Sequence, residues 1–260
     1  MITIYYEKWW RLIRKSIAIG SVILLWQVIP SVGLVDPRSL PPFSDVILGL
    51  IHLIVSGELF DDLLISLQRS MLGFSLSILV AIPLGIFMGW FKSFESIVDP
   101  LIQISRNTAT LALYPVFILI FGLGELSKIG IIFWGCIWPI LINTIAGVRN
   151  VEPILIKVAK SMSISTYALF QKVILPAAVP SIISGLRISA THSIIILVAA
   201  EMLGARAGLG FLIFDARNKY EIPTMYAGIL VLIILGMTVN YLIVEFEKYC
   251  TKWKGVTEKI

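Results

Sequence analysis

The sequence predicts an all-α integral membrane protein with six membrane-spanning helices, and its composition, apolar segments and charge distribution support that fold class. Of the 260 residues, 58% are hydrophobic and only 14% are charged, whereas soluble domains carry about 25% charged residues. Six apolar segments each hold about 20 residues, enough for a helix to cross about 30 Å of hydrocarbon. A chain of this composition cannot cover a water-facing surface, so most of it must face lipid.

The apolar segments define the predicted order of the chain. A retained first span is favoured over a cleaved signal peptide, because no small-residue cleavage site precedes Pro30. Pro83 and Pro139 lie inside spans and predict kinks whose freed carbonyls are satisfied by neighbouring helices. The predicted spans are 17–35, 67–90, 101–121, 129–148, 181–203 and 222–244. The predicted parts are an N-terminal arm (1–16), the first helix with its extracytoplasmic loop (17–62), a core of five helices (63–248) and a tail (249–260).

The distribution of basic residues predicts the orientation. Fifteen of the 21 lysines and arginines fall on one side of the six-span scheme and six on the other. Because cytoplasmic loops are enriched in basic residues, both termini and segment 149–180 are expected in the cytoplasm of a multi-pass cell-membrane protein. The net charge of +5 does not indicate a nucleic-acid partner, since the cations cluster at segment ends and form no stripe with interleaved aromatics.

Residue patterns for catalysis or cofactor binding are missing from the sequence. Cys136 and Cys250 lie far apart without metal-ligand spacing, so neither a disulfide nor a metal site is expected. The stretch 122–128, GLGELSK, lacks the spacing of a phosphate-binding loop. No carboxylate pair or Ser/His/Asp set supports catalysis. The chain is therefore predicted to be neither an enzyme nor a cofactor-binding protein.

The polar segment between the fourth and fifth spans is the longest that the scheme leaves in the cytoplasm. Residues 154–162 and 166–173 predict two short helices, with Ser163 and Ser165 suited to the break between them. Pro176 and Pro180 are expected to end the second helix. It would show Tyr167, Leu169 and Phe170 to the cytoplasm. Exposed apolar groups on a short helix suit a partner's groove, but the spacing equally fits a helix resting on the lipid surface.

This segment resembles the EAA loop of ABC importer permeases. The loop pattern is Glu-Ala-Ala, three residues, Gly, nine residues and then I-x-L-P. The spacing is intact here, although Lys157 stands at the glutamate and Ser163 at the glycine. The positions that the resemblance assigns to coupling with an ATPase are Lys157, Val158, Ala159, Ser163, Ser165, Tyr167, Leu169, Phe170, Val173, Leu175 and Pro176.

The resemblance extends along most of the chain. The stretches 40–50, 66–89, 114–129, 142–153 and 199–213 are similar, in order and spacing, to the nitrate/sulfonate/taurine/bicarbonate branch of the binding-protein-dependent type I permeases. The resemblance implies a type I importer permease fold with a coupling helix between helices 4 and 5. It also implies a homodimer with two cytoplasmic ATPase subunits, which bind ATP-Mg, and an extracytoplasmic solute-binding protein. A small anion such as nitrate, sulfonate, taurine or bicarbonate is the implied solute.

Ionisable and polar residues within the spans are candidates for the transport path, because such groups are costly in a membrane. His192 and Glu201 lie nine residues apart in the fifth predicted span, so both can face one channel. Asn143 is the third candidate, although a buried amide more often joins helices. Arg106 and Arg187 are expected near cytoplasmic helix ends, where long side chains reach the interface.

The sequence also bears on two other classes of function and on an alternative solute. A stand-alone secondary transporter or channel would be indicated by inverted repeats with paired broken helices, and no such pairing is visible. A membrane-embedded enzyme would need a reactive cluster at one depth, and none is visible either. Within the importers, a heterocyclic vitamin precursor is the alternative solute. Copurification of an ATPase separates an importer permease from a transporter that works alone.

Overall fold

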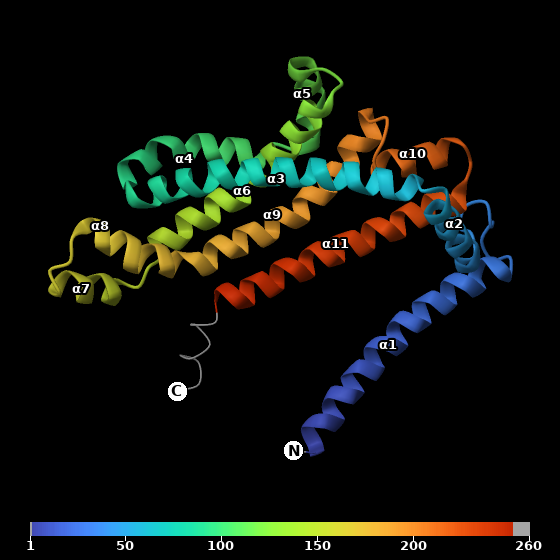
Figure 1. The fold of residues 1–260 in the computed structure, drawn as a ribbon, viewed down its shortest axis with the longest axis horizontal. Coiled ribbons are helices and arrows are strands. Elements are labelled where there is room, and N and C mark those ends of the chain that lie inside the picture. Colours follow the sequence, from blue (N-terminus) through green and yellow to red (C-terminus); the bar gives the residue numbers. More distant parts are fainter. Residues whose placement is uncertain (1, 252–260) are drawn as a thin grey trace. The chain divides into compact units, whose positions relative to one another are not determined.

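The structure is a computed structural model that describes residues 2–251, with side-chain surroundings from residue 17 onward. The described chain is helical and contains no strand (Figure 1). The predicted cytoplasmic arm (1–16) and the tail beyond residue 251 carry basic residues, and their side chains lie outside the part that the structure describes. The elements are α1 Ile2–Ser31, α2 Phe43–Ser56, α3 Glu58–Trp90, α4 Lys92–Asn107, η1 Thr110–Leu113, α5 Tyr114–Phe121, α6 Glu125–Arg149, α7 Pro153–Ser161, α8 Thr166–Leu169, η2 Phe170–Ile174, α9 Leu175–Gly204, α10 Leu209–Asn218 and α11 Ile222–Cys250.

Four helices among the described residues are long and apolar enough to cross a membrane: α3, α6, the continuous helix Thr166–Gly204, and α11. A fifth crossing is possible if the bent pair of α4 with η1 and α5 counts as one span. The apolar part of α1 with described side chains, Ile17–Ser31, is shorter than a full span. The membrane class is therefore confirmed, and the exact number of six crossings stays a prediction.

The third predicted span, 101–121, is not one straight helix. The chain turns by 89° between α4 and the helical stretch Thr110–Phe121. The side chains of Asn107 and Thr108 donate to the carbonyls of Gln103 and Ile104, at 2.8 and 2.9 Å. Such local side-chain bonds compete with the backbone ladder and favour a helix end.

The chain forms two compact units, and each is described by itself. One unit combines the chain through Asp61 with Leu212–Val231, and the other combines Asp62–Phe211 with the chain from Leu232 onward. In the first unit the Trp26 indole donates to the Pro41 carbonyl at 3.1 Å and packs edge-on against Phe43 and Tyr226. Trp26 thus joins α1 to α2 and to the beginning of α11.

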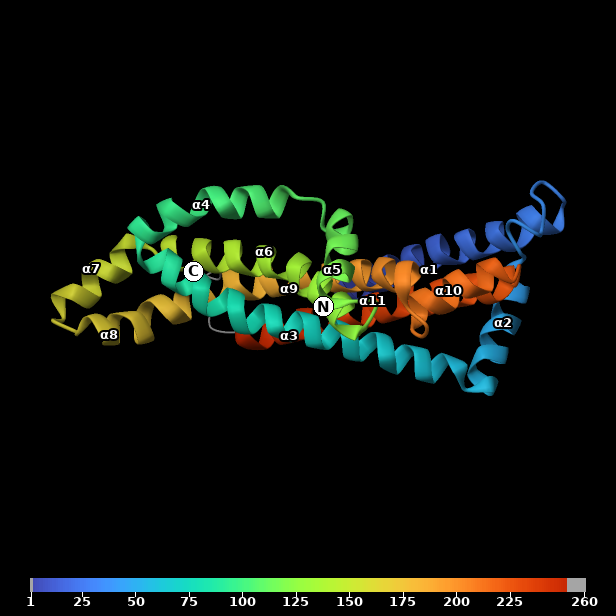
Figure 2. The ribbon, with the colours of Figure 1, turned by 90° about the horizontal axis from the view of Figure 1, so that it is seen from above.

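In the second unit α6 is the central helix, packed between α3 and α9 (Figures 1 and 2). Glycines permit the close approach on both sides. A Cβ at Gly85 of α3 would lie 2.7 Å from the Thr144 Cβ, and one at Gly185 of α9 would lie 2.8 Å from the Asn143 Cβ. Membrane helices associate through small residues at such contacts, because lipid supplies no hydrophobic drive between helices.

Gly85→Ala is expected to destabilise the protein by about 1–3 kcal/mol, the usual cost of overpacking a close contact. The added methyl would meet the Thr144 Cβ and the Leu141 carbonyl, and a backbone group cannot turn aside. The free energy of unfolding in mixed micelles, followed by tryptophan fluorescence, measures the effect. Gly236→Ala is the matched control, because no atom lies within 4 Å of its added Cβ. Equal stability of the two variants would contradict the close α3–α6 contact.

Candidate functional site: the α7–α8 corner and a buried ionic cluster

The α7–α8 corner, residues 153–174, is built by a short break between two helices. The chain turns at Ser163, which has a positive φ of 54°. Ser165 then caps α8, and its Oγ accepts the Ala168 N–H at 3.3 Å. The predicted helix break at these two serines is confirmed. The left-handed backbone at Ser163 explains why the EAA loop pattern has a glycine at this position, since glycine adopts a positive φ without strain.

The corner rests on a buried apolar base. Leu169 and Ala159 are buried in a cluster with Val148 of α6, and the Phe170 ring packs edge-on against Trp90 of α3 at 5.4 Å. The expectation that Leu169 and Phe170 face the cytoplasm is therefore wrong, because their side chains hold the corner to α3 and α6. Tyr167 alone of the three is exposed, at 73%.

The other positions assigned to coupling divide in the same way. Lys157, Val158, Ser163, Ser165 and Pro176 are exposed, while Val173 and Leu175 are half-buried. The half-buried pair and the packed residues Ala159, Leu169 and Phe170 form one face of the corner, which packs on the helices. The exposed residues form the other face, which is open. Met162 and Val158 add exposed apolar side chains to the open face beside Tyr167.

The second helix of the corner does not end at Pro176. It continues through η2, a π-helical turn, into α9, so that Thr166–Gly204 is one helix. Within η2 the Leu175 N–H donates to the Phe170 carbonyl, five residues back. A proline lacks the N–H and crowds the carbonyl four residues before it. The wider π turn accommodates Pro176 without a break.

Ser163→Gly is expected to stabilise the corner by about 1 kcal/mol, because a residue with a Cβ is strained in the left-handed conformation. The expected effect shows as slower hydrogen exchange of amides in 153–174. Lys157→Gly is the control, since Lys157 is exposed in the middle of α7, where glycine costs about 1 kcal/mol. A destabilising Ser163→Gly substitution would mean that the serine side chain has a role of its own.

The three path candidates have different surroundings. His192 is exposed on α9 and lines a pocket with Thr191 and Asn240. Asn143 is partly buried, and its side-chain amide donates to the Pro139 carbonyl of its own helix at 2.8 Å. Glu201 is buried in an ionic cluster. The structure therefore does not bring these three side chains together.

The ionic cluster surrounds the Glu201 carboxylate, whose side chain is 0% exposed. Ser66 Oγ donates to both carboxylate oxygens at 2.8 and 2.9 Å, Arg69 Nη1 donates at 2.7 Å, and the Gly210 N–H donates at 2.8 Å. A Cβ at Gly208, where φ is +115°, would lie 2.7 Å from Arg69 Nη1. Glycine at this position is needed for the loop after α9 to close over the ion pair.

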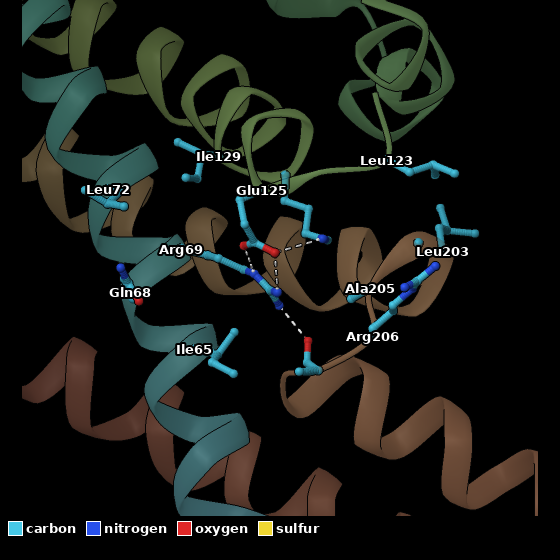
Figure 3. A pocket seen from close by; sticks show the side chains of 13 residues that line it. Ile65, Gln68, Arg69, Leu72, Leu123, Glu125, Ile129, Leu203, Ala205 and Arg206 are labelled. Carbon is cyan, nitrogen blue, oxygen red and sulfur yellow. Dashed lines mark hydrogen bonds and ion pairs between the residues drawn. The ribbon is translucent and has the colours of Figure 1, made fainter. Parts of the chain in front are cut away.

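The same arginine also binds Glu125 at the start of α6. Arg69 Nε and Nη2 donate to the two Glu125 oxygens at 2.5 and 2.7 Å, and Nη1 donates to the Ala207 carbonyl at 2.6 Å (Figure 3). Lys128 Nζ lies 3.2 Å from Glu125 Oε1. One arginine on α3 thus ties together α6, α9 and the loop that follows α9.

Sequence reasoning missed most of this cluster. Arg69 is one of the basic residues counted for the orientation alone, and Glu125 lies in the stretch 122–128, which was considered only as a phosphate-binding loop and rejected. A usable signal existed, because Arg69 and Glu201 carry opposite charges at the ends of spans predicted to lie on the same side. The remaining members, Ser66, Gly208 and Gly210, have no charge and gave no signal.

Several long apolar helices, with a polar corner between two of them, define a multi-pass membrane protein. The chain belongs to the family of binding-protein-dependent transport system inner membrane components, whose profile matches residues 81–249. It is therefore a permease of the ABC importers, a transport subunit of the membrane.

Relatives that align with nearly the whole chain are named as permeases too. A putative aliphatic sulfonates transport permease protein, SsuC of Bacillus subtilis (strain 168), is 38% identical over 94% of this chain and 89% of its own length. The taurine transport system permease protein TauC of Escherichia coli (strain K12) is 33% identical over 95% and 94%. The nitrate import permease protein NrtB of Synechocystis is 32% identical over 91% and 88%.

Solved structures share the fold. An inward-facing MetNI methionine ABC transporter matches with a TM-score of 0.65 at 16% identity, covering 73% of this chain and 94% of that chain. An amino acid ABC transporter with bound histidines matches with a TM-score of 0.60, over 77% of this chain and 97% of that chain. At such low identity the likeness shows the fold alone, that of ABC importer permeases.

Proposed function

We propose that two copies of this chain form the translocation path of an ATP-driven importer, with two cytoplasmic ATPase subunits and one extracytoplasmic binding protein. The observation that carries the proposal is Tyr167, which is 73% exposed on the open side of a corner whose other side packs on α3 and α6. An exposed aromatic on a fixed helix suits insertion into a partner's groove. ATP-Mg binds to the ATPase partners, and this chain holds no cofactor.

The proposed topology has six crossings with both termini in the cytoplasm. The bent α4–α5 pair and the helix α1 supply the two crossings beyond the four long apolar helices. In this topology the α7–α8 corner faces the cytoplasm and acts as the coupling helix. The continuity of α8 with α9 supports a direct transfer of motion, because a push on Tyr167 acts on one end of a single helix.

The solute is proposed to be a small anion such as a sulfonate, taurine, nitrate or bicarbonate. The names of the sulfonate, taurine and nitrate permeases among the relatives support this choice. A heterocyclic vitamin precursor is the alternative within the same class. Identifying the ligand of the cognate binding protein decides between them.

The path is proposed to run along the polar face of α9. Arg187, Thr191 and His192 are exposed there, and Asn240 of α11 lies beside them in a pocket of about 510 Å³. Polar groups in a membrane helix are costly against lipid and normally face a water-filled cavity or another helix. His192 is therefore proposed to line the path, while Asn143 and Glu201 hold the helices that form its wall.

Copurification tests the proposed function. The tagged chain, purified from its native cells in mild detergent, is expected to carry an ATPase subunit in equal amount. The native mass of the complex is expected to equal that of two permease and two ATPase subunits. ATP hydrolysis of the reconstituted complex is expected to rise when the loaded binding protein is added. A chain that purifies alone and moves solute at full rate without ATP would instead be a stand-alone transporter.

A further inference from the structure

A pocket of about 1000 Å³ lies among α3, the start of α6 and the end of α9 with its following loop (Figure 3). Pockets for small molecules commonly measure about 300–1000 Å³. The apolar part of its lining is aliphatic: Ile65, Leu72, Leu123, Ile129 and Leu203. Its charged lining holds three cations and one carboxylate: Arg69, Lys128, Arg206 and Glu125.

The carboxylate in this pocket is far more exposed than the cations it binds. The side chains of Arg69 and Lys128 are 5% and 4% exposed, whereas that of Glu125 is 56% exposed. Glu201 occupies Nη1 of Arg69 from the buried side, and the Nε and Nη2 donors both face Glu125. An open carboxylate thus covers the outer edge of a buried guanidinium.

We propose that this pocket binds an anionic solute with a compact oxyanion head group, which replaces the Glu125 carboxylate on Arg69 and Lys128. The inference rests on the proposed function, because it assigns the pocket to the solute that the importer carries. In the proposed topology α3 and α6 begin and α9 ends on the extracytoplasmic side. The pocket therefore receives solute from the binding protein.

The chemistry of the pocket selects for negative charge. The planar Nε and Nη2 donors of an arginine match two oxygens of a carboxylate, sulfonate or nitrate group. Exchanging one anion for another keeps both buried cations paired, whereas a neutral solute in place of Glu125 would leave Lys128 without a counter-ion and Arg69 with Glu201 alone. Glu125 can move into water because its side chain is already half exposed, and Arg206 adds an exposed cation at the rim. The aliphatic walls accept a short carbon chain.

Ethanesulfonate is the test ligand, with ethyl methyl sulfone as its neutral counterpart. Binding is measured by titration calorimetry on the purified complex in phosphatidylcholine nanodiscs. Glu125→Gln is expected to raise the affinity for ethanesulfonate about tenfold or more, because it removes the competing carboxylate; one charge-assisted hydrogen bond corresponds to at least that factor. Neither form is expected to bind the sulfone.

Arg206→Gln keeps the test decisive if Glu125→Gln fails to fold, since Arg206 is exposed and takes no part in the buried cluster. Its affinity for ethanesulfonate is expected to fall about twofold to fivefold, as for the loss of one exposed ion pair. Lys219→Gln, which changes an exposed cation after α10, is expected to leave the affinity unchanged. Unchanged affinity in Arg206→Gln, or equal binding of the sulfone, would overturn the proposal.

An anionic lipid headgroup has the same oxyanion chemistry as the proposed solute. A second experiment, which varies the lipid, distinguishes the two. Ethanesulfonate affinity is expected to be the same in nanodiscs of phosphatidylcholine and of phosphatidylglycerol. Loss of ethanesulfonate binding in phosphatidylglycerol would assign the pocket to lipid and overturn the proposal. The ATPase activity of the same preparations is a separate readout. A complex that hydrolyses ATP but lacks Glu125-dependent binding refutes the pocket alone, and a chain without an ATPase refutes the proposed function alone.

Discussion

Arg69→Met is expected to cost about 3–5 kcal/mol of stability, the range for breaking a buried ion pair by removing one partner. The substitution leaves the fully buried Glu201 carboxylate with only Ser66 and the Gly210 N–H as donors. It also removes the bonds from α3 to Glu125 and to the Ala207 carbonyl. Equilibrium unfolding in mixed micelles, followed by tryptophan fluorescence, measures the loss.

A double variant separates the charge effect from lost packing. Arg69→Met combined with Glu201→Gln is expected to recover more than half of the loss, because a neutral amide needs no counter-ion. Lys219→Met is the control, since Lys219 is exposed and its ion pair with Asp215, which raises its pKa, lies on the surface. An Arg69→Met loss as small as that of the control would show that Glu201 does not depend on Arg69.

Tyr167→Asp is expected to abolish ATP-driven transport and to release the ATPase during purification. Tyr167 is the exposed aromatic of the corner, and removing an aromatic anchor from an interface typically costs about 2–4 kcal/mol. That cost lowers affinity by about thirtyfold to a thousandfold. The chain itself is expected to stay folded, because Tyr167 takes no part in the buried base. ATPase retention on the tagged chain and solute uptake by proteoliposomes measure the two effects.

Two variants make this result specific. Tyr220→Asp is the matched control, because Tyr220 is also exposed, at 87%, but lies in the loop after α10, on the opposite side of the proposed topology. It is expected to leave ATPase binding intact. Phe170→Asp would be uninformative, since Phe170 packs on Trp90 and its loss disturbs the fold. Full ATPase retention in Tyr167→Asp would remove the corner from the interface.

The fold class could be predicted from the sequence because it follows from composition and from long apolar runs. The ends of the helices were harder to predict, because they depend on local contacts that a hydropathy pattern does not reveal. The turn between α4 and α5 lies at Thr108 and Ala109, whose backbone is extended. The continuity of α8 and α9 depends on a π turn that accommodates Pro176, whereas a proline at this place predicts a helix end.

The corner was predicted better than the ionic cluster, because its residues are contiguous in the chain. The break at Ser163 and Ser165 follows from local chemistry. The direction of Leu169 and Phe170 was wrong, and so was the helix end expected at Pro176 and Pro180. The cluster joins Ser66 to Glu201 across 135 residues. Such a pairing depends on how three helices pack, and the sequence signals it only through the opposite charges of Arg69 and Glu201.

Site-directed thiol labelling tests the central claim most directly. Tyr167→Cys is introduced with Cys250→Ser; the remaining Cys136 is buried. A membrane-impermeant maleimide is expected to label position 167 in inside-out vesicles only. Addition of the ATPase subunit is expected to block that labelling. Tyr220→Cys, in the same background, is expected to react in right-side-out vesicles only. Labelling of position 167 from the outside, or labelling that the ATPase leaves unchanged, would contradict the claim that this corner carries the contact with the motor.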